Sequence, residues 1–111
     1  MTDNQSNQRL YGMLGLAMRA GKVIVGTEQV CIGLSKGKIH LVLISTEASE
    51  GTKKKIGFKC EFYNVRSLKV NICTEELGRL LGKTYGPAAV GIADENFANV
   101  LSSIITDSRT V

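Results

Sequence analysis

The sequence predicts an α/β protein with a three-layer α/β/α sandwich, in which helices and strands alternate around one mixed sheet of about four strands. The alternation runs along the whole chain, with no linker, internal repeat or low-complexity segment. Residues 39–45 are apolar almost throughout, which is typical of a central strand covered on both faces. Glycine follows several helical patterns, at Gly21, Gly37 and Gly82, where a left-handed residue commonly ends a helix.

Two helices and a short strand are expected before residues 39–45. Apolar residues at helical spacing predict the first helix over 4–20. The β-branched run at 23–25 predicts a strand. Helical spacing returns over 27–36, where Val30 and Leu34 are expected to face inward.

The middle of the chain predicts a third helix followed by a strand. Ser49 is placed to cap this helix, and its buried stripe is expected to contain Ile56, Cys60 and Tyr63. Lysines fill the remaining positions at Lys53, Lys54, Lys55 and Lys59, a pattern usually found on a solvated face. The alternation over 68–72 predicts a strand that is less completely buried than 39–45.

The last third of the chain predicts two more helices separated by a strand. Thr74 has the hydroxyl of a capping residue, and two acidic residues follow it in the first turn. A strand of small residues is expected over 88–93, and Asp94 is placed to cap the final helix. The apolar stripe of that helix is predicted to consist of Phe97, Val100, Leu101, Ile104 and Ile105.

Composition limits the class of protein. The 111 residues suit one domain spanning 1–111, and the net charge of +4 favours an anionic partner such as RNA. Neither a membrane span nor a signal peptide is visible, so a cytoplasmic location is expected. Cys31, Cys60 and Cys73 have no metal-ligand spacing and are expected to be reduced and buried, with no disulfide, metal or cofactor.

The segment from Arg19 to Gln29 carries the strongest functional signal. It predicts a helix end, a short strand, and then Gly26 opening a new helix whose free backbone N–H groups can hold a phosphate or a base edge. Lys22 lies on the same segment. A purely structural alternative is that Gly26 makes a tight corner and Thr27 caps the helix.

Three motifs give the chain a resemblance to a known family. They are Ala20-Gly21-Lys22, Gly26-Thr27 and the run from Glu76 to Gly82. With the order of elements, they resemble the ribosomal protein L7Ae/L30e family and, within it, the bacterial YlxQ proteins. The resemblance implies a helix–strand sandwich that binds kink-turn RNA, a duplex bent sharply at a short bulge followed by sheared G·A pairs.

In that family the RNA is bound by a Gly-Thr-Asn-Glu corner, by a lysine one turn further on, and by an apolar loop before the last strand. Gly26 and Thr27 match the corner, whereas Glu28 and Gln29 hold the acid and the amide in reverse order, and Ile32 replaces the lysine. Glu28 is either a reader of base edges or a simple first-turn helix acid.

The loop implied by the family corresponds to Thr84, Tyr85, Gly86 and Pro87. Tyr85 is either a stacking platform for an extruded base or a tyrosine at the surface or the edge of the core. Lys22 and either Lys36 or Lys38 are expected to contact phosphates, which adds affinity without sequence information.

The expected function is therefore a non-enzymatic, ribosome-associated module that binds kink-turn-like RNA. Ribosome-associated proteins are possible partners, and neither a membrane nor a small-molecule substrate is expected. The alternative is a protein-interaction module on the same fold that has lost RNA binding, since Ile32 offers no charge. Lysines converging around Gly26 would favour RNA, and an exposed apolar patch there would favour a protein. An enzyme is disfavoured, because no complete catalytic motif is present.

Overall fold

The computed structural model describes the backbone of residues 2–110 and the side chains of residues 8–106. Within this range helices and strands alternate without exception: α1 (Thr2–Arg19), β1 (Val23–Val25), α2 (Thr27–Ser35), β2 (Leu41–Ser45), α3 (Glu50–Phe62), β3 (Arg66–Val70), α4 (Thr74–Leu80), β4 (Ala89–Ile92) and α5 (Glu95–Thr110). The described helices include none that is both long and apolar enough to cross a membrane.

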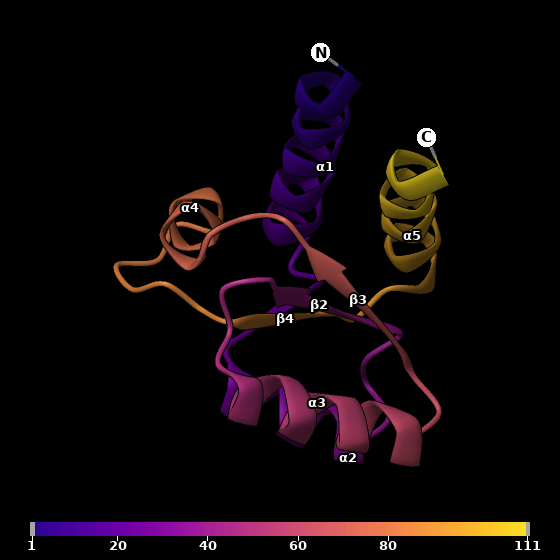
Figure 1. Cartoon of the computed structure of the whole chain (residues 1–111). Coiled ribbons are helices and arrows are strands. Elements are labelled where there is room, and N and C mark those ends of the chain that lie inside the picture. The colour runs from indigo at the N-terminus through magenta and orange to yellow at the C-terminus, as the bar shows by residue number, and fades with distance from the viewer. Residues whose placement is uncertain (1, 111) are drawn as a thin grey trace.

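The four strands form one mixed sheet in the order β1-β4-β2-β3. Strand β2 pairs in parallel with β3 and antiparallel with β4, and β1 pairs antiparallel with β4. Helices α2 and α3 cover one face of the sheet, and α1, α4 and α5 lie on the other (Figure 1). The predicted α/β/α sandwich is confirmed.

Strand β2 is the centre of the core, as its apolar sequence predicts. All five of its residues are buried. Since side chains alternate between the faces of a strand, Leu41 and Leu43 enter the core under α1, α4 and α5, while Val42 and Ile44 enter the core under α2 and α3. The uninterrupted run of apolar residues thus reflects two separate cores.

Three strands differ from their predicted limits. Strand β2 begins at Leu41 rather than at residue 39, β3 covers 66–70 rather than 68–72, and β4 covers 89–92 rather than 88–93. The pairing of Leu41 with Arg66 and of Ser45 with Val70 sets the limits of β3. Ile72 lies beyond the strand, although it is buried, and its carbonyl oxygen accepts a hydrogen bond from Ser45 Oγ at 2.7 Å. The buried part of this segment therefore extends past the last paired residue of β3.

Several predicted inward positions are wrong. Tyr63 follows the last residue of α3 and is 37% exposed, and Val100 is 41% exposed at the rim of α5. Cys73 is exposed, whereas Cys60 is buried. Burial raises the pKa of the Cys60 thiol to about 11, and the nearby Cys31 contributes in the same direction. The expectation of three buried cysteines therefore holds for Cys60 but fails at Cys73, and Cys31 is only half-buried.

Candidate functional site

The candidate site begins at Gly26, the residue that precedes α2. Gly26 has φ 104° and ψ 147°, a conformation that residues with a side chain rarely adopt. Its carbonyl oxygen accepts the amide of Val30 at 2.9 Å, which closes the first turn of α2. Gly26 is thus the N-cap residue, and the alternative in which Thr27 caps the helix is wrong.

The N-terminus of α2 is open, in contrast to the following helices. Among the side chains that the structure describes, none caps its first turn. Ser49 Oγ caps α3 by accepting the Thr52 amide at 3.1 Å, and Asp94 Oδ2 caps α5 by accepting the Phe97 amide at 2.9 Å. The first amides of α2 therefore keep donor capacity and partial positive charge for an external acceptor.

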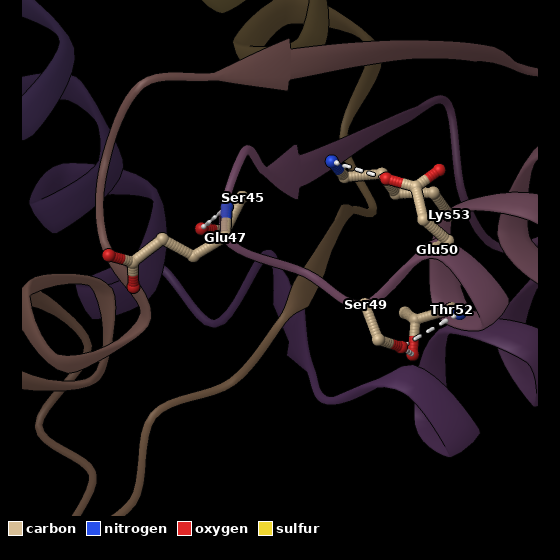
Figure 2. Close-up of polar contacts among 6 residues, drawn as sticks. All are labelled: Ser45, Glu47, Ser49, Glu50, Thr52 and Lys53. Carbon is tan, nitrogen blue, oxygen red and sulfur yellow. Dashed lines mark hydrogen bonds and ion pairs between the residues drawn. The ribbon is translucent and has the colours of Figure 1, made fainter.

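The N-terminus of α4 is capped by a side chain from a distant part of the sequence rather than by a residue next to the helix. Glu47, in the loop between β2 and α3, accepts the amide of Thr74 through Oε1 at 3.1 Å. The predicted capping by Thr74 is wrong, because Thr74 is the first helical residue and Cys73 the N-cap. Ser45 Oγ holds this loop by accepting the amide of Glu47 at 3.1 Å, and Figure 2 shows Glu47 extending away from Ser49.

The exposed face of α2 next to this N-terminus carries Glu28, Gln29 and Ile32. Glu28 and Gln29 are exposed in the first turn, and Ile32 is 45% exposed one turn further on. Val30 is completely buried and anchors the other side of the helix. An acid, an amide and an apolar side chain thus face outward together.

The segment from Thr84 to Pro87 lies against α4. A Cβ on Gly78 would sit 2.1 Å from the carbonyl oxygen of Tyr85, and one on Gly86 would sit 2.9 Å from the backbone of Thr74. Pro87 is buried, whereas Tyr85 is 54% exposed. The two glycines permit the close contact that holds the loop while the Tyr85 ring stays accessible.

A surface pocket of about 450 Å³ opens beside this loop. It is lined by Thr74, Glu75, Arg79, Lys83, Thr84, Tyr85 and Gly86. Arg79 is exposed and pairs with Glu76. This hydrogen bond raises the pKa of the Arg79 guanidinium, so the group stays protonated. The pocket therefore combines an accessible ring with two cations and the Glu75 carboxylate, and Glu76 partly offsets the charge of Arg79.

The α2 corner and the Tyr85 loop meet at one end of the sheet. The Gly26 amide donates to the Ala89 carbonyl oxygen at 3.0 Å, and the Ser45 amide donates to the Ala88 carbonyl oxygen at 2.9 Å. Ala88 and Ala89 directly follow Pro87. Backbone hydrogen bonds thus connect the two halves of the predicted site.

The predicted lysine contacts do not gather at this end. Lys22 precedes β1, so about 13 Å of extended strand separates it from Gly26, and its carbonyl oxygen accepts the amide of Ala93 at the far end of β4. Lys36 and Lys38 follow the end of α2, at least about 15 Å along the helix from Gly26. A strand or a helix separates each of these lysines from the corner, so they do not supply the convergence around Gly26 that would favour RNA. That they contact phosphates stays a prediction.

Four residues of the site were not predicted from the sequence: Arg79, Lys83, Gly78 and Glu47. Arg79 and Lys83 flank the predicted loop in the sequence, and their charge next to Tyr85 was an available signal. A glycine inside a helix, such as Gly78, also signals a close approach of another backbone. No local pattern indicates that Glu47 caps α4.

Together the fold and the site define an α/β/α domain with an open helix N-terminus beside an aromatic loop. The chain matches the family model of the ribosomal protein L7Ae/L30e/S12e/Gadd45 family over residues 8–102. It therefore belongs to this family, and the family resemblance seen in the sequence is confirmed.

Individual relatives match over nearly their full length. The chain is 37% identical to the RNA-binding protein YlxQ of Bacillus subtilis, over 90% of this chain and 98% of that one. It is 31% identical to the large ribosomal subunit protein eL30 of Sulfolobus acidocaldarius, over 88% and 94%. A solved structure from Bacillus halodurans matches with a TM-score of 0.81 at 34% identity, over 87% of this chain and 96% of that one.

A more distant structure shows the same fold. The 15.5kD RNA binding protein of Giardia lamblia matches with a TM-score of 0.75 at 16% identity, over 96% of this chain and 89% of that one.

Proposed function

We propose that this protein binds structured RNA of the kink-turn type through the open N-terminus of α2 and the Tyr85 loop. The observation that carries the proposal is the uncapped first turn of α2, which the Gly26–Ala89 hydrogen bond joins to the loop. Membership of a ribosomal protein family and the relatives named RNA-binding proteins support RNA as the ligand.

The first turn of α2 supplies the polar contacts in this proposal. Its free amides are donors for a phosphate oxygen or for an acceptor on a base edge. The Glu28 carboxylate only accepts hydrogen bonds, so it suits an exposed base amino group and is repelled by phosphate. The Gln29 amide both donates and accepts. A widened groove that presents base edges fits this combination better than a regular duplex does.

The loop supplies stacking and charge. Tyr85 is exposed enough for its ring to stack on an unpaired base, and Arg79 and Lys83 lie in the same pocket to contact the backbone of that nucleotide. Lys22, Lys36 and Lys38 lie away from the corner, so in this proposal only RNA that extends beyond the kink reaches them.

Homology to eL30 proteins supports ribosomal RNA as the source of the ligand and ribosome association as the setting. A protein partner is the second candidate, favoured by the 45% exposure of Ile32 beside the corner.

The test is a titration of the protein against a kink-turn RNA and a matched duplex from which the bulge has been deleted. We expect a clear preference for the kink-turn, with an affinity that falls steeply with salt because phosphate contacts release counterions. Equal and weak binding of both RNAs would overturn the proposal and leave the protein-partner alternative.

A further inference from the structure

The outer face of α3 exposes two large aromatic side chains that the candidate site does not use. Phe58 is 71% exposed and Phe62 is 80% exposed. They are four positions apart, which places them on the same face of the helix, one turn apart. Phe62 also meets Tyr63 edge to face, with ring centroids 4.9 Å apart. Such exposure of apolar rings on one helix face indicates a binding surface.

Lysines surround these rings. Lys54 and Lys55 are both exposed. They lie one turn before Phe58 and Lys59, respectively, and Lys59 is partly exposed. At the start of α3, Glu50 pairs with Lys53 at 3.4 Å, which neutralises that charge (Figure 2). The face thus combines a net positive charge with two rings, although Glu61 lies near its end.

The combination of lysines and aromatic rings favours one class of partner over the others. A second copy of the chain would bring like charges together, which is unfavourable. Lysine is depleted at protein–protein interfaces, whereas aromatic side chains are enriched there. Single-stranded nucleic acid uses both groups at once, because bases stack on the rings and phosphates meet the lysines.

The position of α3 connects this face to the candidate site. The helix begins directly after Ser49, in the loop that follows β2, and β2 ends beside Ala88 at the same end of the sheet as Gly26. Phe58 lies eight residues into α3, about 12 Å from its start at the rise of an α-helix. A strand that leaves the corner along α3 therefore reaches the first ring within a short distance.

We infer that Lys54, Lys55, Phe58, Lys59 and Phe62 form a second contact surface, which binds a single-stranded flank of the RNA held at the Gly26 corner. The inference rests on the proposed function. In it, bases of the flank stack on Phe58 and Phe62, and the lysines contact its phosphates.

The experiment compares the full chain on two kink-turn RNAs, one with blunt ends and one with a single-stranded uridine tail. Four proteins are used: the wild type, the double variant Phe58→Ala/Phe62→Ala, the double variant Lys54→Ala/Lys55→Ala, and the control Leu16→Ala/Val100→Ala. Leu16 and Val100 are 48% and 41% exposed on α1 and α5, the opposite face of the sheet. The control thus removes exposed apolar groups without touching α3.

We expect the tail to raise the affinity of the wild type and the control by roughly tenfold or more, the scale of one stacked base. The phenylalanine variant should lose this gain and bind the blunt RNA as the wild type does. The lysine variant should lose part of the gain and show a smaller salt dependence on the tailed RNA. Photocrosslinking from thiouridine in the tail should label α3 peptides.

Other outcomes are distinguishable. If the blunt kink-turn is bound and the tail adds nothing, this inference fails while the proposed function stands, and the α3 face becomes a candidate for a protein partner. If the blunt kink-turn is not preferred over its bulge-deleted duplex, the proposed function itself fails. A gain from the tail that the phenylalanine variant retains would also overturn the inference.

Discussion

The amide of Gly26 donates a hydrogen bond to the carbonyl oxygen of Ala89 at 3.0 Å, and this bond joins the start of α2 to the strand that follows the Tyr85 loop. Residues far apart in the sequence therefore share one end of the sheet. An RNA contact at the α2 amides would lie at the end of the sheet where the Tyr85 loop leads into β4.

Replacement of Gly26 by alanine should destabilise the protein and weaken RNA binding. The cost comes from the backbone, since an added Cβ meets no atom within 4 Å but φ is 104°. A residue held in such a region costs on the order of 1–3 kcal/mol. Urea unfolding measures the loss. The control Gly12→Ala, on the exposed side of α1 with nothing within 4 Å, should instead be stabilising. An unchanged Gly26→Ala protein would contradict the assigned backbone conformation.

Replacement of Gly78 by alanine should displace the loop at Tyr85. The new Cβ would lie 2.1 Å from the Tyr85 carbonyl oxygen, so either the loop or α4 must move. We expect a loss of about 1–3 kcal/mol in the free energy of unfolding and weaker binding of the kink-turn. The matched variant Gly57→Ala changes a glycine inside α3 that has nothing within 4 Å, and it should be neutral or stabilising. Equal effects of the two substitutions would show that the loop contact is unimportant.

Alkaline pH should destabilise the protein through Cys60. Burial raises the pKa of its thiol from the ordinary value of 9.0 to about 11. The folded state therefore favours the neutral thiol, and its stability is complete below pH 9 and declines as the pH rises toward 11. Unfolding measured on both sides of this range should show the decline, and the variant Cys60→Ala should show a smaller one, since burial also raises the pKa of the Tyr11 hydroxyl. In the native protein, exposed Cys73 should react with a thiol reagent before Cys60 does.

Restoration of the family residues should tighten binding to a standard kink-turn. The triple variant Glu28→Asn, Gln29→Glu, Ile32→Lys returns the amide, the acid and the lysine to the family order. Ile32 is 45% exposed, so a lysine there should fold without difficulty. Each restored base contact is worth roughly 1–3 kcal/mol. A well-folded triple variant that binds no better than the parent would show that the α2 corner is not the surface that reads the RNA.

Local patterns were sufficient to predict the elements. The apolar run at 39–45 predicted the central strand, and Ser49 and Asp94 predicted two of the caps, because each depends on neighbours in the sequence. The predicted limits of β3 were wrong by two residues at each end. Pairing with β2 sets the observed limits, whereas Ile72 is buried without being part of the strand.

The candidate site could be predicted only in part. Gly26 was visible because its effect is local, whereas the bond from Glu47 to Thr74 spans 27 residues and has no local pattern. Proximity in the sequence also misled the interpretation of Lys22, which is four residues from Gly26 but lies at the other end of β1.

We propose that the α2 corner and the Tyr85 loop form one RNA-binding surface. An NMR titration of the isotope-labelled protein with the kink-turn RNA, following individual backbone amides, tests this. We expect the amides of Thr27, Glu28 and Tyr85 to shift together, with the same dependence on RNA concentration, while those of Lys22 and Lys38 change little. Large shifts confined to Lys22, Lys36 and Lys38, with Thr27 and Tyr85 unaffected, would contradict it.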